Sequence, residues 1–282
     1  MWFVIAFVIW ALGFWINHKL ANGEYGQSRA TRIAIPTIFG LTILFVWECL
    51  VRGFDVPMVI LPPPTAIAVR FGTSLDILWI DFVQTFIKGA LSGYVIGCGS
   101  AFIIAILIDG SRFLKKGLLP VGNFIAALPI VGTAPIFVMW FGFDWQSKAA
   151  VVVAMVFFPM LVNTVQGLAA TNLMQRDLMA TYSANYIQSL LKLRLPAALP
   201  AVFNGLKVAT TLALIGAIVA EFFGSPIKGM GFRISTEVGK LGLDMVWAEI
   251  TVAAIAGSAF YGIVSIIEKA LTFWHPSQRG HA

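Results

Sequence analysis

Long apolar segments alternate with short polar connections along the whole chain. Each segment is close to the ~20 residues that an α-helix needs to cross the hydrocarbon core of a bilayer. The runs are continuously apolar, whereas membrane β-strands alternate apolar and polar residues. The pattern therefore predicts an all-α, polytopic helical membrane protein with about seven transmembrane helices, at residues 1–17, 32–53, 83–108, 117–142, 149–168, 201–224 and 247–270.

The first of these segments, MWFVIAFVIWALGFWIN, also has the length of a signal peptide. It lacks the positively charged start of such a peptide. We therefore interpret residues 1–17 as a retained transmembrane helix.

The connection between the second and third segments is not a plain loop. Leu61-Pro62-Pro63-Pro64 is stiff and cannot enter a helix interior. The residues after it predict a short helix, with Thr65 as a candidate cap. We expect this helix to lie along the outer membrane interface.

The polar stretch from Asp177 to Pro196, DLMATYSANYIQSLLKLRLP, carries an apolar stripe that a water-exposed loop does not need. Its members recur at helical spacing: Tyr182, Tyr186, Leu190 and Leu193. An amphipathic helix of this kind is suited to a groove on a soluble partner. The stretch therefore predicts a membrane protein that is driven by a separate soluble subunit.

Composition and charge agree with this class. The chain is 59% hydrophobic and 11% charged, with a mean hydropathy of +0.88, whereas soluble domains are roughly a quarter charged. The net charge of +6 suits cationic cytoplasmic connections and requires no nucleic-acid partner.

Connections on the side of the Asp177–Pro196 stretch hold eleven lysines and arginines, against six on the other side. We therefore expect that stretch and the C-terminus to be cytoplasmic and the N-terminus to be outside.

Small residues recur at every fourth position of the third segment, at Gly89, Gly93 and Gly97. Such spacing lets two membrane helices approach closely, inside a bundle or across a dimer. The alternative is the ordinary abundance of glycine in membrane helices.

Cys49 and Cys98 lie in apolar runs, and the three histidines are scattered, so we predict no metal site.

Polar residues and prolines at membrane depth are candidates for a transport path. Three prolines interrupt the fourth segment, and broken helices often line such paths, although plain kinking is the alternative. Glu221 is either an interface carboxylate bonded to backbone or a gate that faces the solute. The predicted path residues are Asn123, Trp140, Phe141, Asn163, Thr164, Thr210, Thr211 and Glu221.

Several chemistries have no motif in this sequence. No G-x-x-x-x-G-K-[ST], H-E-x-x-H or G-x-S-x-G pattern occurs, and no pair of intramembrane carboxylates is apparent. We therefore predict no catalytic residues and no cofactor on this chain. The alternatives to a partner-driven transporter are an ATP-independent secondary transporter or channel, and a membrane-embedded enzyme.

The Asp177–Pro196 stretch resembles the cytoplasmic loop of binding-protein-dependent ABC importer permeases, whose pattern is E-A-A-x-x-x-G, nine residues, then I-x-L-P. Asp177 takes the acidic place, Leu195-Pro196 the end, and Ser183 the place of the glycine. Further stretches resemble the permeases for sulfonates, taurine, nitrate and vitamin precursors. These are Leu61–Thr65, Pro135–Gly142, Phe157–Thr164, Val219–Glu221 and Gly229–Phe232.

The resemblance implies a type I ABC importer permease core, with an additional N-terminal helix, in the bacterial inner membrane. It implies partners as well: an ATP-binding cassette subunit that holds ATP and Mg, a periplasmic or lipid-anchored solute-binding protein, and a second permease copy in a homodimer embedded in lipid. The regions would be 1–31 for the extra helix and linker, 32–82 for the flanking helix and external segment, 83–272 for the core with its coupling loop at 169–200, and 273–282 for the tail.

The resemblance also places a short coupling helix around Ser183–Leu190 that docks on the ATP-binding subunit. The residues that it assigns to coupling are Asp177, Tyr182, Ser183, Ala184, Asn185, Tyr186, Leu190, Leu195 and Pro196.

Overall fold

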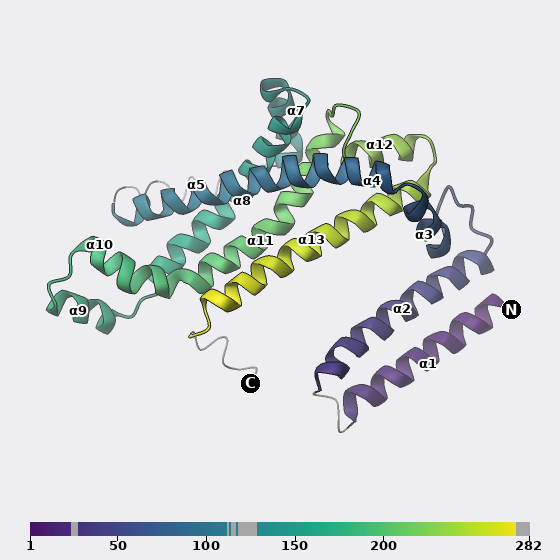
Figure 1. The fold of residues 1–282 in the computed structure, drawn as a ribbon, viewed down its shortest axis with the longest axis horizontal. Helices are drawn as coiled ribbons and strands as arrows, with labels where there is room; N and C mark the ends of the chain where they lie inside the picture. Colours follow the sequence, from purple (N-terminus) through teal and green to yellow (C-terminus); the bar gives the residue numbers. More distant parts are fainter. Residues whose placement is uncertain (24–27, 112, 114–116, 118–128, 275–282) are drawn as a thin grey trace. The chain divides into compact units, whose positions relative to one another are not determined.

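The computed structural model of the chain describes residues 1–23, 28–111, 113, 117 and 129–274. All regular structure in these residues is helical (Figure 1), which confirms the predicted fold class. The elements are α1 Trp2–Asn22, α2 Arg29–Gly53, α3 Pro64–Thr73, α4 Leu75–Phe82, the π-helix η1 Val83–Leu91, α5 Ser92–Asp109, α7 Ile130–Phe141, α8 Trp145–Ala169, α9 Leu173–Thr181, α10 Tyr186–Ser189, the π-helix η2 Leu190–Arg194, α11 Leu195–Phe222, α12 Met230–Gly239 and α13 Leu243–Leu271.

Six helical segments of the described chain are long and apolar enough to cross a membrane: Trp2–Asn22, Ala30–Gly53, Leu75–Asp109, Trp145–Ala169, Tyr186–Phe222 and Leu243–Leu271. The span expected at 117–142 lies partly outside the described residues, and α7 is its described part. The third and fifth segments have 35 and 37 residues, more than a bilayer requires. They exceed the predicted bounds because α4 and α10 continue without a break through η1 and η2.

The chain folds as two units. One comprises Met1–Leu78 with Ile234–Ile250, and the other comprises Trp79–Arg233 with Thr251–Ala282. In the first unit α1 packs along α2. Gly13 permits this contact, because a Cβ atom there would lie only 2.3 Å from Thr42 Oγ1.

Thr65 does not cap the short helix after the prolines. Helix α3 has Pro63 at its cap position and Pro64 in its first turn, where the fixed φ and the missing N–H of proline are favourable. The Thr65 hydroxyl instead donates to Glu48 Oε1 at 2.8 Å and accepts from Arg52 Nη2 at 3.1 Å. The predicted cap is therefore wrong, and Thr65 ties α3 to the end of α2.

Helix α8 is the central element of the second unit. It packs against η1, α5, α7 and α11. The apolar core between these helices is built mostly from small and β-branched side chains that exclude solvent. Its fully buried members include Ala101, Ala105, Val152, Val156, Leu161, Leu168, Ala209, Ala213 and Ala217.

The three predicted packing glycines all face α8. A Cβ atom on Gly89 would lie 3.3 Å from Lys148 Cβ, one on Gly93 2.6 Å from Val152 Cβ, and one on Gly97 2.5 Å from Val156 Cγ2. The contact is therefore inside the chain. Helices can approach this closely only where side chains are very small.

Helix α11 has an equivalent stripe that the sequence reading did not single out. Gly205, Ala209, Ala213 and Ala217 recur every four residues and are all buried. Gly205 meets Asn163 of α8, since an added Cβ atom would lie 3.0 Å from Asn163 Cβ. Small residues on both sides therefore hold α8 between α5 and α11.

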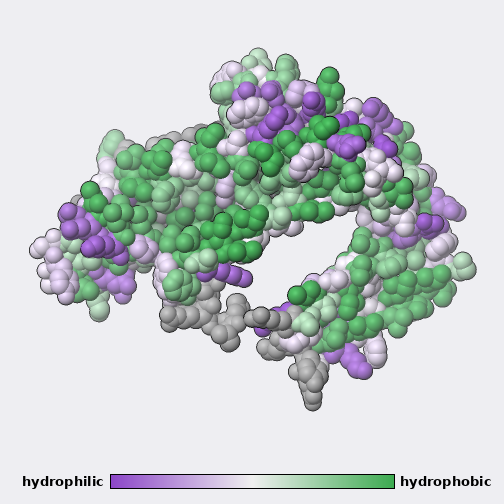
Figure 2. Space-filling model, in the orientation of Figure 1, coloured by the Kyte–Doolittle hydropathy of each residue, from purple (hydrophilic) through white to green (hydrophobic). Residues whose placement is uncertain are grey.

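Large apolar side chains cover much of the face shown in Figure 2. Phe7 on α1, Ile103 on α5 and Ile266 on α13 are 66%, 60% and 69% exposed. A soluble protein rarely exposes contiguous apolar surface of this extent, whereas lipid-facing helices do. Hydrophilic side chains gather instead around α9–α10 and near α12.

Replacing Gly93 with alanine should destabilise the protein by about 1–3 kcal/mol, because the added methyl group overlaps Val152 and the Ala149 carbonyl oxygen. Gly99→Ala is the matched control on the same helix, since nothing lies within 4 Å of its Cβ position. Thermal unfolding of the purified protein in detergent should show a lower midpoint for Gly93→Ala alone. Equal midpoints for the two variants would contradict the close packing.

Candidate functional site

Two short helices and a tight turn form the segment between α8 and α11. Asn172 caps α9 and Asn185 caps α10, each as part of a capping box completed by Gln175 or Gln188. Ser183 lies between the two helices with φ +53. These local signals divide the segment, so the short helix expected around Ser183–Leu190 begins only at Tyr186, as α10, and continues directly into η2.

The conformation of Ser183 explains the glycine of the resembling pattern. A φ of +53 lies in the left-handed region, which glycine adopts without the steric cost that other residues incur. The backbone at Ser183 therefore takes a conformation that glycine would adopt at a lower steric cost.

The predicted coupling residues divide into an exposed tip and a packed base. Asp177, Tyr182, Ser183, Asn185 and Tyr186 are exposed, and Ala184 is half-buried. Leu190 is buried in the apolar core, while Leu195 and Pro196 are half-buried at the start of α11. The segment thus presents polar and aromatic side chains outward on a base that is part of the helical core.

A junction that the sequence reading missed holds this base in place. Arg194 donates from Nη1 and Nη2 to both oxygens of Asp109, each at 2.5 Å. Its Nε and Nη2 also donate to the Leu168 carbonyl oxygen, at 3.1 and 2.9 Å. The Tyr186 hydroxyl donates to Asp109 Oδ2 at 3.0 Å. The sequence signal was one acid at the end of an apolar run and one arginine before Pro196.

Only some of the predicted path residues face outward. Thr164 and Thr210 are buried and donate to carbonyl oxygens of their own helices, at Met160 and Lys207. Thr211 is exposed. Trp140 and Phe141 are exposed at the end of α7, at 71% and 51%. Asn123 lies outside the described residues.

Asn163 of α8 meets Asn204 of α11 at the surface of the second unit. Asn204 Nδ2 donates to Asn163 Oδ1 at 3.1 Å, and Asn163 Nδ2 donates to the Pro159 carbonyl oxygen at 2.8 Å. Asn204 is exposed, and Thr211 follows it two helical turns later. Together these residues place polar groups along one exposed face at membrane depth.

Glu221 is buried at the other end of α11, with 2% exposure. It accepts hydrogen bonds from the Thr85 hydroxyl at 2.8 Å and from the Gly231 N–H at 2.7 Å. Of the two roles considered for it, these contacts match a carboxylate bonded to backbone. Gly229 has φ +118, and an added Cβ atom there would lie 2.3 Å from Glu221 Oε1, so only glycine fits this turn.

A second buried carboxylate secures the same turn. Asp81 Oδ1 accepts from the Gly229 N–H at 2.6 Å, and Asp81 Oδ2 accepts from Arg233 Nε at 2.8 Å. Thr85 also accepts from the Met230 N–H at 2.7 Å. The sequence reading assigned no role to Asp81, Thr85 or Arg233. The available signal was an acid and a threonine four residues apart, on one face of a helix.

Several other charged groups in the described part of the second unit have partners within it. Lys207 forms an ion pair with Glu268 at 2.8 Å between α11 and α13. Lys148 is buried, and its Nζ donates to the Phe143 carbonyl oxygen at 2.5 Å. Gln84 Nε2 donates to Asp144 Oδ1 at 2.9 Å, and this bond lowers the pKa of Asp144, which precedes α8.

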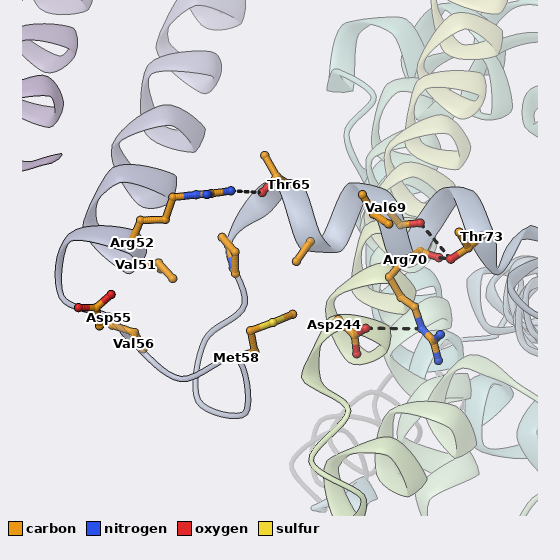
Figure 3. Close-up of a pocket in the computed structure, with 12 residues that line it drawn as sticks. Val51, Arg52, Asp55, Val56, Met58, Thr65, Val69, Arg70, Thr73 and Asp244 are labelled. Atoms are coloured by element: carbon orange, nitrogen blue, oxygen red, sulfur yellow. Dashed lines mark hydrogen bonds and ion pairs between the residues drawn. The ribbon is translucent and has the colours of Figure 1, made fainter.

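A cavity of about 720 Å³ lies in the first unit, between the end of α2, the following loop, α3 and Asp244 (Figure 3). Arg52 points to Thr65, and Arg70 points to Asp244 at 3.7 Å. Arg52 also pairs with Glu48. Since each arginine is matched by an acid, this cavity offers no net positive site for an anion.

Comparison with known proteins places the chain in a family. Residues 93–273 match the family model of the binding-protein-dependent transport system inner membrane component. A formylaminopyrimidine transport permease protein of Halalkalibacterium halodurans is 32% identical, over 89% of this chain and 100% of its own. A probable ABC transporter permease protein of Haemophilus influenzae is 30% identical, over 82% of this chain and 93% of its own. A riboflavin transport system permease protein of Chloroflexus aurantiacus is 29% identical, over 87% and 91%.

The chain therefore belongs to the binding-protein-dependent transport system inner membrane component family. It is a multi-pass inner membrane protein and a permease subunit of an ABC importer for a small solute. Membership favours this function over an ATP-independent transporter or channel. An ATP-binding subunit and a solute-binding protein are its partners in such a system.

Thr85→Val should lower the stability of the protein by about 1–3 kcal/mol, because the buried Met230 N–H loses its acceptor and the Glu221 carboxylate loses one of its two donors. Thr85→Ser retains the hydroxyl and serves as the control. We expect the thermal unfolding midpoint in detergent to fall for valine and to stay near the original value for serine. Equal stability of the two variants would show that the hydroxyl does not matter.

Proposed function

We propose that the Asp177–Pro196 segment is the element through which a separate ATP-binding subunit drives this permease. The observation that carries the proposal is the exposed tip on a packed base. Tyr182, at 77% exposure, and Ser183 are available to a partner, while Leu190 is held in the helical core. ATP and Mg would be bound by the partner, and this chain would contribute no catalytic residue.

The distribution of lysines and arginines supports an orientation in which the Asp177–Pro196 segment faces the cytoplasm. The side of the bilayer with more lysines and arginines is the cytoplasmic side, and it includes Arg176, Lys192 and Arg194. The N-terminus would then lie outside, the C-terminus in the cytoplasm, and the Glu221 turn at the periplasmic end of the core. A solute-binding protein, periplasmic or lipid-anchored, would deliver the solute to that end.

Changing Ser183 and Ala184 together to arginine should lower solute uptake by about tenfold or more while ATP hydrolysis continues, because bulk and charge would displace the docked tip. Ser183→Gly is the matched control, since glycine suits the φ of +53 and adds no bulk. Uptake and ATPase rates should be measured in proteoliposomes that contain the complete importer. Full uptake by the double variant would exclude this segment as the docking element.

The translocation path would run along the exposed face that carries Asn163, Asn204 and Thr211. A polar group exposed to hydrocarbon is unfavourable, so this face is expected to meet water or solute during transport. Trp140 and Phe141 are further exposed candidates. Thr164, Thr210 and Glu221 would have structural roles, since their polar groups are bonded within the core. A small organic solute or anion, as the names of the relatives indicate for those proteins, would move along this face.

Cysteine accessibility tests this path. In a chain whose two cysteines, Cys49 and Cys98, are replaced, Asn204→Cys and Thr211→Cys should react with a charged methanethiosulfonate reagent, because the thiol ionises only in water. Ile103→Cys, on an exposed apolar face of α5, is the control and should stay unreacted. No reaction at Asn204→Cys and Thr211→Cys in the transporting importer would place the path elsewhere.

In the described part of a single permease chain, the face that carries Asn204 and Thr211 is exposed, so we propose that two copies face each other across the path in lipid. The symmetric closed dimer is the commonest assembly for identical subunits. Light scattering of the purified importer should give two permease copies with two ATP-binding subunits. A transport-active complex with one permease chain would overturn this stoichiometry.

A further inference from the structure

The junction around Asp109 links three elements that are separated in the sequence. Asp109 ends α5, Leu168 lies in the last turn of α8, and Arg194 ends η2, just after α10. The Arg194 guanidinium contacts the first two at once, through Asp109 and the Leu168 carbonyl oxygen. The loop base is therefore bonded directly to the ends of two transmembrane helices.

Burial and geometry make this a rigid connection. The side chains of Asp109 and Arg194 are only 4% and 14% exposed. Two parallel N–H···O bonds fix the orientation of the guanidinium as well as its distance, which a lysine ammonium cannot do. The helix C-terminal end also favours a cation, because the last carbonyl groups of α8 have no partner in their own helix.

Tyr186 extends the junction toward the exposed tip. Its hydroxyl donates to Asp109 Oδ2, and the hydroxyl oxygen lies 3.6 Å from the position that a Cβ atom on Gly110 would take. One carboxylate thus receives bonds from both ends of the α10–η2 segment. A displacement of α10 must then move Asp109 and Leu168 with it, unless these bonds break.

We infer that Arg194 and Asp109 are positioning residues that transmit the movement of the loop to α5 and α8. This inference rests on the proposed docking role of the Asp177–Pro196 segment, and it adds the residues that pass the motion on. Helix α8 carries Asn163 on the proposed path, so movement at Leu168 acts on the path through one continuous helix. The tip receives the partner, and the junction determines which helices follow.

Arg194→Gln should leave binding of the ATP-binding subunit and basal ATP hydrolysis near their original levels. Solute uptake per ATP hydrolysed should fall about tenfold, since the charge-assisted bonds that hold the loop to α5 and α8 are lost. Arg194→Lys should show an intermediate loss, because it keeps the charge without the planar fork. The ratio of uptake to hydrolysis is the readout, since a merely structural role would lower both rates together.

Arg176→Gln is the matched control. Arg176 lies in α9, directly before Asp177, but its bonds to Thr171 Oγ1 and to the Ala169 carbonyl oxygen are local and do not reach α5. Its uptake per ATP should stay within about twofold of the original value. If Arg194→Gln assembles with its partner and keeps the original ratio, the junction has no role in transmission, and the docking proposal still stands on the Ser183–Ala184 result.

A distance measurement decides the question even if Arg194 variants do not assemble. Spin labels on Leu107 of α5 and Lys192 of η2, both exposed, leave the junction intact. With one labelled chain per complex, the label distance should stay constant to within about 2 Å between nucleotide-free and vanadate-trapped importer, since rigid packed elements move as one body. A larger change in that distance would overturn the inference.

Discussion

The lack of water in the bilayer core constrains every polar group of the membrane-spanning helices. A hydrogen-bonding group there must find a partner in the chain, because lipid offers none. Thr164 and Thr210 bond to their own helices, Lys207 pairs with Glu268, and Glu221 receives bonds from Thr85 and Gly231. Asn163 and Asn204 differ from these groups. They bond to each other, but Asn204 is exposed, so part of its hydrogen-bonding capacity remains available to water or solute.

The apolar centre and its two polar ends have different physical bases. In the centre, Gly93, Gly97 and the small residues of α11 let helices pack within van der Waals contact, and dispersion between close backbones holds them. At one end, Asp81 and Glu221 fix the turn before α12. At the other end, Asp109 and Arg194 fix the base of the loop. Charged, directional bonds thus set the positions of the connecting segments, while non-directional packing sets the distances between helices.

This division suits a permease that works with a separate ATP-binding subunit. A packed core transmits displacement because it deforms little, and its ends must be joined firmly to whatever applies the force. The tip of the α9–α10 segment stays exposed, with Ser183 in a backbone form that glycine prefers. Family membership implies an ATP-binding partner, and the exposed tip suits the docking role proposed for it.

The sequence by itself determined the class of fold, because long continuous apolar runs leave only helices as a solution in lipid. It also identified the Asp177–Pro196 segment and the glycines that face α8, since both signals are local and periodic. Local signals also misled: Thr65 looks like a cap, but the prolines before it start the helix, and Glu48 takes its hydroxyl.

Only the tertiary structure decided which polar side chains form hydrogen bonds in the core and which remain exposed. Thr164 and Asn163 are neighbours in the chain, yet one bonds to its own helix and the other meets Asn204. Asp109 and Arg194 are 85 residues apart, and Asp81 and Arg233 are 152 apart. No periodicity within a single sequence links such partners, because their pairing arises from how the helices cross.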